Sequence, residues 1–211
     1  ADFVIINRID ELTPAEVHEL RSLIEEQFPG RPVLSMSART GDGFDDVCEF
    51  LNQRGAFGRR VMELDYDVYA EGEAELGWLN SQVLVESNTA FDLDALLLDV
   101  INRLKQRMAE TNAETAHLKT IGLTDGFYAV ANLVSSFTSA ELSLPSQAQV
   151  KSTHVVVNAR VATDPELLAE QVRSVIAAAC DRINARHAVE TLQSFRPGRP
   201  VPTHRLVEAT V

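Results

Sequence analysis

Short apolar runs alternate with amphipathic stretches in the first quarter of the chain. Residues 3–7 (FVIIN) and 32–37 (PVLSMS) are apolar runs of the kind that forms strands buried on both faces. Residues 13–30 and 41–53 repeat apolar positions at helical spacing. The order strand, helix, strand, helix indicates a parallel sheet with crossover helices, although two strands are too few for a stable domain of this class.

Capping signals mark the first of these helices. Thr13 can cap its N-terminus, Glu16 completes a capping box, and Pro14 suits the first helical position. The second helix is expected to begin near Asp45, after a loop rich in Ser, Thr and Gly.

The rest of the chain changes to longer strands and two strongly amphipathic helices. Helices are predicted over 91–111 and 164–183, and the second is capped by Asp164 or Thr163. Strands are predicted over 81–87, 117–123, 127–136, 141–145 and 153–161. An antiparallel sheet backed by two helices, in the ferredoxin-like style, is the natural packing of these elements.

The predicted organisation therefore has four parts. An α/β segment with a partial parallel sheet spans residues 1–56, and a linker follows at 57–62. An α+β domain with an antiparallel sheet and two helices spans 63–195. A tail rich in Pro and Arg, expected to be extended, spans 196–211.

Composition and charge exclude several classes of partner. The 211-residue chain is 45% hydrophobic and 24% charged, as in globular proteins, and its net charge of −12 argues against nucleic acid as a partner. No window approaches the roughly 18 apolar residues of a membrane span, so no membrane association is expected, and the first residues lack a basic leader. Cys48 and Cys180 are expected to be reduced and buried, in a cytoplasmic protein.

Two weaker features bear on metal binding. Five acidic residues spaced in twos would share one face of an extended chain: Asp65, Asp67, Glu71, Glu73 and Glu75. They could form a surface that binds a hard cation, or they could belong to a solvated edge strand. His117 and His154, near predicted strand starts, are candidates to meet across a sheet and bind a metal. No nucleophile motif occurs, so no catalytic residue is assigned.

Polar residues follow the first predicted strand directly, in the order Asn7-Arg8-Ile9-Asp10. The carboxyl ends of parallel strands are where α/β proteins bind ligands. Asp10 can accept two hydrogen bonds from the ring N–H and amino group of guanine, an edge that adenine lacks. Asn7 can donate to the base and brace the loop, while the stem of Arg8 covers the ring face. Alternatively, Asn7 and Asp10 only form a turn and cap the next helix.

The second predicted strand ends in Ser37-Ala38-Arg39-Thr40-Gly41, and neighbouring parallel strands end side by side. The small Ala38 lets its backbone N–H approach the carbonyl oxygen of the base, and Ser37 can steady the loop. The alternative is a loop that caps the following helix. Together the two motifs favour guanine recognition by a set of six residues: Asn7, Arg8, Asp10, Ser37, Ala38 and Arg39.

These motifs carry a family resemblance. "NRID" and "SART" resemble the last two guanine-recognition motifs of P-loop GTPases, commonly NKxD and SAK, with Arg8 where Lys is usual. Residues 65–80 (DYDVYAEGEAELGWLN) and the domain after them resemble the C-terminal region of CobW-like, cobalamin-synthesis-type GTPases. The resemblance implies GTP or GDP with Mg²⁺ as ligand of the parent protein, Zn or Co as a possible metal cargo, and a metallochaperone role. It also implies a metalloenzyme or cofactor-synthesis client protein, or a second copy of the chain, as partner.

The phosphate-binding parts of that family do not occur in this sequence. There is no GxxxxGK[ST] loop and no CxCC motif, and in the family both precede the NKxD-type motif. The resemblance therefore implies the C-terminal portion of a longer GTPase, which does not hydrolyse GTP as this chain. Guanine nucleotide binding is expected to be weak, because the phosphates supply most of the binding energy.

Two other functions remain open at this point. The chain can be a non-catalytic protein-interaction or dimerisation module without a nucleotide role, in which NRID and SART are ordinary caps. A metal-storage or sensing domain built on the acidic stretch is the third candidate.

Overall fold

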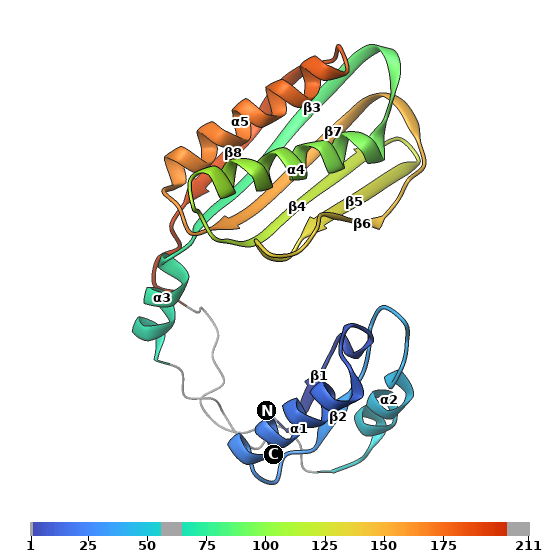
Figure 1. Cartoon of the computed structure of the whole chain (residues 1–211), viewed down its shortest axis with the longest axis vertical. Helices are drawn as coiled ribbons and strands as arrows, with labels where there is room; N and C mark the ends of the chain where they lie inside the picture. Colours follow the sequence, from blue (N-terminus) through green and yellow to red (C-terminus); the bar gives the residue numbers. More distant parts are fainter. Residues whose placement is uncertain (1, 56–64, 202–211) are drawn as a thin grey trace. The chain divides into compact units, whose positions relative to one another are not determined.

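The structure is a computed structural model that describes residues 2–55 and 65–201 (Figure 1). The chain divides into two compact units, residues 1–64 with 201–211 (unit 1) and residues 65–200 (unit 2). The predicted linker at 57–62 lies outside the described residues, as do residues 202–211 of the predicted tail.

Unit 1 contains the predicted strand–helix–strand–helix order. Strands β1 (Val4–Ile6) and β2 (Val33–Ser35) pair in parallel, with α1 (Pro14–Gln27) between them in the chain and α2 (Phe44–Asn52) after β2. The capping box between Thr13 and Glu16 is confirmed: the Glu16 backbone N–H donates to the Thr13 hydroxyl, and the Glu16 carboxylate accepts from the Thr13 backbone N–H. This segment is thus the partial α/β arrangement that the pattern predicts.

Unit 1 buries little apolar surface. Helix α1 has no buried residue. Leu23 on it is 55% exposed, and its C-cap Phe28 is 51% exposed. Only four apolar side chains are buried among the described residues of this unit: Ile6, Val33, Met36 and Val47. Since parallel sheets are normally covered on both faces, unit 1 presents apolar surface that a complete sheet of this class would bury.

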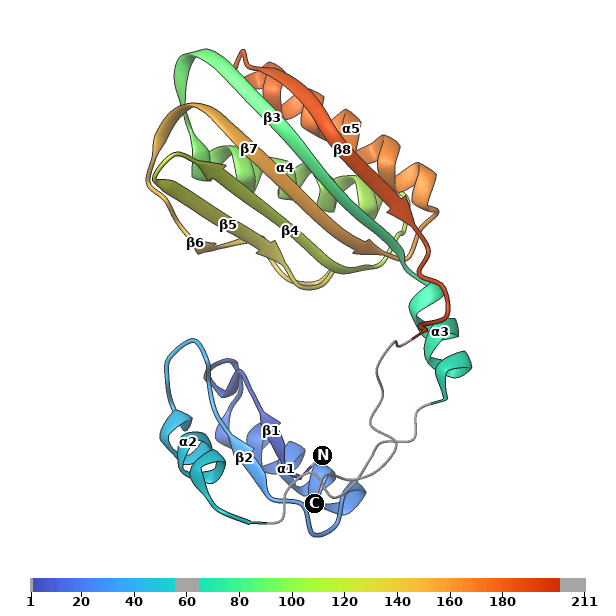
Figure 2. The same cartoon turned by 180° about the vertical axis from the view of Figure 1, so that it is seen from behind.

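Unit 2 is a six-stranded antiparallel sheet with two long helices on one face (Figures 1 and 2). The helices are α4 (Leu93–Glu110) and α5 (Pro165–Arg182), and the order across the sheet is β6-β5-β4-β7-β3-β8. The strands are β3 (Gly77–Asp92), β4 (Thr115–Thr124), β5 (Phe127–Leu133), β6 (Glu141–Leu144), β7 (Gln149–Val161) and β8 (Arg186–Phe195). The predicted fold class, an α/β segment followed by an α+β domain, is confirmed.

The core of unit 2 lies between the sheet and the two helices. The apolar stripe of α4 is buried as predicted: Leu93, Leu96, Leu97, Val100, Ile101, Leu104 and Met108. Helix α5 contributes Leu168, Val172 and Ile176 to the same cluster. Asp92 caps α4, and Asp164 rather than Thr163 caps α5.

The structure corrects the prediction of an extended acidic stretch and adds a strand. Residues 66–74 form helix α3 (Tyr66–Ala74), and Asp65 caps it by accepting from the N–H groups of Asp67 and Val68. The five acids therefore do not align on one face of a strand, because a helix turns successive residues by about 100°. Strand β8 was not predicted, because most of its side chains are exposed and lack an alternating apolar pattern.

The start of the predicted tail packs onto α3. The guanidinium of Arg196 donates to the carbonyl oxygens of Ala74 and Glu75, and that of Arg199 pairs with Asp67 at 2.5 Å. In the described part of the chain, no helix combines the length and apolarity that crossing a membrane requires.

We expect the two units to differ sharply in local stability. Amides of β1 and β2, such as Ile6, should exchange with solvent at least about a hundredfold faster than those of Val83 in β3, because each further buried aliphatic side chain contributes about 1.5–3 kcal/mol. Hydrogen exchange followed by NMR measures this, with Val189 on the edge strand β8 as internal reference. Equal protection at Ile6 and Val83 would contradict the expectation.

A carboxylate clamp joins the start of α4 to the turn before β7. One carboxylate oxygen of Asp94 accepts from the N–H and hydroxyl of Ser146, and the other accepts from the Gln147 N–H, at 2.8–2.9 Å. Burial acts to raise the pKa of Asp94, but these hydrogen bonds together outweigh it and lower the pKa below its ordinary value of 3.8.

The clamp predicts a pH-dependent loss of stability. Because the pKa of Asp94 is lower when folded, its contribution is present above the ordinary pKa and disappears as pH falls through the folded-state pKa. Asp94→Asn should cost about 1 kcal/mol at neutral pH and less in acid, after allowance for partial exposure. Urea unfolding from pH 7 to pH 2 tests this, with Asp125→Asn in the exposed β4–β5 turn as the matched control. A cost that does not fall with pH would contradict it.

Candidate guanine-recognition site

The site candidates lie where the two strands of unit 1 end. Ile6 pairs with Ser35 at the ends of β1 and β2, and backbone hydrogen bonds between the two segments continue beyond this pair. The Met36 N–H donates to the Ile6 carbonyl at 2.8 Å, and the Ile9 N–H donates to the Met36 carbonyl at 3.3 Å. The two loops therefore leave the sheet side by side, and residues 7–10 face residues 36–38.

Asp10 and Ser37 meet across these loops. Ser37 is fully buried, and its hydroxyl donates to one carboxylate oxygen of Asp10 at 2.5 Å. The same hydroxyl accepts the backbone N–H of Thr40 at 3.2 Å. Both hydrogen-bonding roles of the hydroxyl are thereby used, and the Asp10 carboxylate is held in one orientation.

Asn7 braces the second loop. Its side-chain oxygen accepts two backbone N–H groups, from Arg8 at 2.8 Å and from Ala38 at 3.0 Å. Two donors on that oxygen assign the orientation of the amide, so the amide nitrogen of Asn7 faces away as a donor. The Ala38 N–H, expected to meet a base carbonyl, is thus engaged by Asn7 in this structure.

Helix capping does not account for these polar side chains. Helix α1 is capped by Thr13, whereas the cap of α2 is Gly43, which has no side chain to contribute. The 3-10 turn over Ile9–Glu11 has Arg8 as its N-cap residue, and the Arg8 side chain makes no capping hydrogen bond. Asn7, Asp10 and Ser37 instead bond to one another's segments across the two strand ends.

The two arginines of the predicted set lie differently. Arg8 has a left-handed backbone, with φ of 65°, and its guanidinium donates to both carboxylate oxygens of Glu11 at 2.7 and 2.5 Å. Glu11 was not among the predicted site residues, although its spacing of three from Arg8 is the usual one for a local ion pair. Arg39 is exposed in the turn after Ala38. Contact of either arginine with a base stays a prediction.

The arrangement presents a hydrogen-bonding edge to solvent. Asp10 is exposed, and only one of its carboxylate oxygens has a partner among the described residues, so the other can accept a donor. The Asn7 amide adds a donor nearby, and the Ala38 N–H becomes a second if Asn7 releases it. Two donors flanking a carboxylate suit a planar ligand that has both donors and acceptors on adjacent edges.

The residues predicted to bind a metal do not lie close together in the structure. On β4, His117 lies opposite Arg160 of β7, whereas His154 of β7 lies opposite Leu123, six residues further along. A separation of about 20 Å follows from the strand rise, so the predicted histidine pair is wrong. Within residues 2–55 and 65–201, no three His, Cys, Asp or Glu side chains gather as metal ligands, and these residues therefore do not fit a Zn or Co site.

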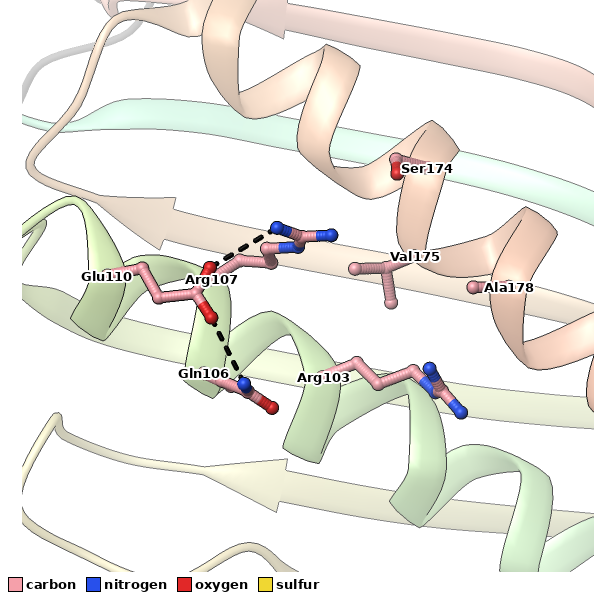
Figure 3. A pocket seen from close by; sticks show the side chains of 7 residues that line it. All are labelled: Arg103, Gln106, Arg107, Glu110, Ser174, Val175 and Ala178. Carbon is pink, nitrogen blue, oxygen red and sulfur yellow. Dashed lines mark hydrogen bonds and ion pairs between the residues drawn. The ribbon is translucent and has the colours of Figure 1, made fainter.

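A separate hollow of about 220 Å³ lies between α4 and α5 (Figure 3). The Glu110 carboxylate accepts from Arg107 at 3.2 Å and from Gln106 at 3.0 Å. Asp99 accepts from Arg103 on its own helix and from Arg182 on α5, at 2.8 and 3.1 Å. These cations already have carboxylate partners, so the hollow is a salt-linked groove between two helices.

Comparison with known proteins gives limited similarity. No protein family model and no curated protein matches the chain. Two solved structures are similar: the Zn(II)-bound YjiA GTPase from E. coli and a Zn(II)-bound triple mutant of YjiA GTPase. Each is 16% identical to this chain with a TM-score of 0.27, and each match covers 85% of this chain and 52% of the solved chain. The chain thus spans about half the length of these structures, and a TM-score this low does not establish a shared arrangement.

Gly43 fixes the second loop of the site. Its φ is +69°, and a Cβ there would lie 2.1 Å from the Ser35 carbonyl oxygen. Gly41 has a similar φ of +85°, but a Cβ there would meet nothing within 4 Å. Comparing alanine substitutions at Gly41 and Gly43 therefore distinguishes the free-energy cost of a left-handed backbone from the added cost of a steric clash.

Gly43→Ala should therefore destabilise unit 1 more than Gly41→Ala does. The left-handed conformation costs each alanine about 1–2 kcal/mol, and the clash with the β2 backbone adds at least about 2 kcal/mol at position 43. Loss of the dispersed amide signals of Asn7 and Ser37 in NMR spectra measures the effect. Similar spectra for the two variants would show that Gly43 does not hold the loop.

Proposed function

We propose that this chain is the guanine-recognition segment and C-terminal domain of a CobW-like GTPase that acts in metal-cofactor assembly or metal delivery. One observation carries the proposal: Asp10 and Asn7 at one strand end are joined by side-chain hydrogen bonds to Ser37 and Ala38 at the neighbouring strand end. Two motifs separated by a whole helix thereby form a single polar edge, at the place where parallel sheets bind ligands.

The match to guanine is chemical. The outer carboxylate oxygen of Asp10, together with the one shared with Ser37, accepts the ring N–H and the amino group of the base. The Asn7 amide supplies a donor for the acceptor atoms on its other edges, and the Ala38 N–H supplies a second one when Asn7 releases it. In adenine the corresponding ring nitrogen is an acceptor and the carbonyl is absent. Adenine would therefore leave the Asp10 carboxylate facing another acceptor.

The exposed apolar surface of unit 1 supports a larger parent domain. Leu23 on α1, Phe28 at its C-cap and Leu51 on α2 are all more than half exposed. Two parallel strands do not bury these side chains, whereas further strands of a GTPase sheet would. In this proposal the phosphate loop, Mg²⁺ and the metal cargo belong to residues outside this sequence, and the chain itself neither hydrolyses GTP nor holds the metal.

A second candidate is an interaction or dimerisation module, and the position of β8 favours it. This ten-residue strand ends the sheet, with β3 on one side and no described strand on the other. Such an edge can pair with a client protein or a second copy of the chain. Under this candidate, base preference is absent and substitutions at Asp10 have no effect on nucleotides.

Exchanging one acceptor for a donor at Asp10 tests base recognition. The wild-type chain should bind GMP in preference to AMP and XMP, weakly, with a Kd of about 1 mM or above, since a few exposed hydrogen bonds contribute about 1 kcal/mol each. Asp10→Asn should reverse the preference to XMP by about tenfold, because xanthine has a carbonyl where guanine has its amino group. Amide shifts of residues 7–10 and 36–40 during NMR titration measure both.

The controls isolate the base from charge and phosphate. All three nucleotides carry the same phosphate, and Asp42→Asn makes the same change of charge at an exposed position of the neighbouring loop. A gain of XMP binding also shows that the variant is folded. Equal shifts with GMP and AMP, or identical behaviour of the Asp10 and Asp42 variants, would leave the interaction-module candidate in place of nucleotide recognition.

A further inference from the structure

The sheet of unit 2 has an open face, the one turned away from α4 and α5 (Figure 2). The strand registers align side chains across this face in rows. One row runs from β8 through β3 and β7 to β4 and consists of Phe195, Trp78, Arg160 and His117. The next row, in the same strand order, consists of Gln193, Asn80, Asn158 and Lys119.

Contacts within the first row orient its side chains. The guanidinium carbon of Arg160 lies 3.9 Å from the ring centroid of Trp78, within cation–π range. The rings of Trp78 and Phe195 lie 6.3 Å apart at 42°. Residues of both rows line a cavity of about 350 Å³, within the size range of small-ligand pockets.

The two rows are basic in an acidic protein. Neither row contains an acid, although the chain has 31 acidic residues against 19 Lys and Arg. No carboxylate of the described residues forms an ion pair with Arg160 or Lys119, in contrast to the arginines between α4 and α5. Burial lowers the pKa of His117, and the charges of Lys119 and Arg160 lower it further, as expected where the local field is positive.

Neutral donors add to this charge. Asn158, Asn80 and Gln193 line the cavity with amide groups. The buried indole N–H of Trp78 has no acceptor among the described residues. The cavity lining combines several amides, an aromatic wall and a guanidinium that has no carboxylate partner among the described residues. Such a lining suits an acceptor with negative charge.

We infer that this open-face cavity binds a small organic anion, with Arg160 contacting its carboxylate or phosphate oxygens and the side-chain amides of Asn158 and Gln193 hydrogen-bonding its polar body. Arg160 is exposed, so its guanidinium is accessible to such a group. Lys119, one row further in, adds charge at longer range. The site is independent of the guanine edge, because every residue in it belongs to unit 2.

Trp78 is the only tryptophan in the chain and lines the cavity, so its fluorescence reports occupancy directly. The full chain is titrated with citrate and with inorganic phosphate, each against chloride at matched ionic strength, and calorimetry provides a readout that does not depend on Trp78. Saturable binding of at least one anion is expected. Preference for citrate identifies carboxylate as the recognised group, and preference for phosphate identifies phosphate.

Arg160→Gln should weaken binding about tenfold or more, the usual loss for a hydrogen bond to a charged group. Arg186→Gln, on the same face at the far end of β8 and 85% exposed, removes the same charge and should leave affinity unchanged. Asn158→Asp places a carboxylate in the cavity at constant size and should abolish binding; it serves as the second variant if Arg160→Gln does not fold. Absence of saturable binding, or equal weakening by the Arg160 and Arg186 variants, overturns the inference.

Discussion

One apolar layer, between the six-stranded sheet and the two long helices, determines the arrangement of unit 2. Side chains alternate across a strand, so the residues that fill this layer also decide which residues lie on the other face. Val83, Val157 and Leu118 point into the layer, and their neighbours on the same strands necessarily point away from it. A shift of one residue in any strand would exchange its buried side chains with those on the other face. Burial of the correct side chains in the core therefore fixes the strand register. The rows of basic and amide side chains on the open face are a direct consequence.

Unit 1 keeps its local geometry by a different means. Its described residues include only four buried apolar side chains and so form no comparable layer, and β1 and β2 contribute three pairs of residues. Beyond the strand ends, side chains replace the backbone ladder: Asn7 holds the Ala38 N–H, and the Ser37 hydroxyl joins Asp10 to Thr40. Polar groups on adjacent loops thus define the candidate site, while apolar side chains of its helices, such as Leu23 and Leu51, are exposed.

Local features were readable from the sequence, whereas features that depend on register were not. The capping box at Thr13, a cap at Asp164 or Thr163 and the apolar stripe of α4 are encoded within a few residues. The structure has helices at these places, with Asp164 as the cap of α5. The proximity of Asp10 and Ser37 followed from one topological rule about parallel strands. The prediction that His117 and His154 meet was wrong, because the pairing of β4 with β7 alone determines which residues lie opposite each other. Strand β8 was not predicted, because an exposed edge strand carries no apolar alternation. Helix α3 was not predicted, because acids at every second position are also compatible with a helix, here one that Asp65 caps.

The hydrogen bonds of the candidate site also limit how tightly a base can bind there. In this structure the Ala38 N–H already donates to Asn7, and one oxygen of Asp10 already accepts from Ser37. A base that takes the Ala38 N–H therefore exchanges one hydrogen bond for another, and the net gain is much smaller than the bond energy. Under the proposed function, the edge contributes discrimination, because the wrong base leaves the Asp10 carboxylate facing an acceptor and the right base does not. In this proposal, an edge of this kind selects among nucleotides, while their affinity comes from contacts to other parts of the nucleotide.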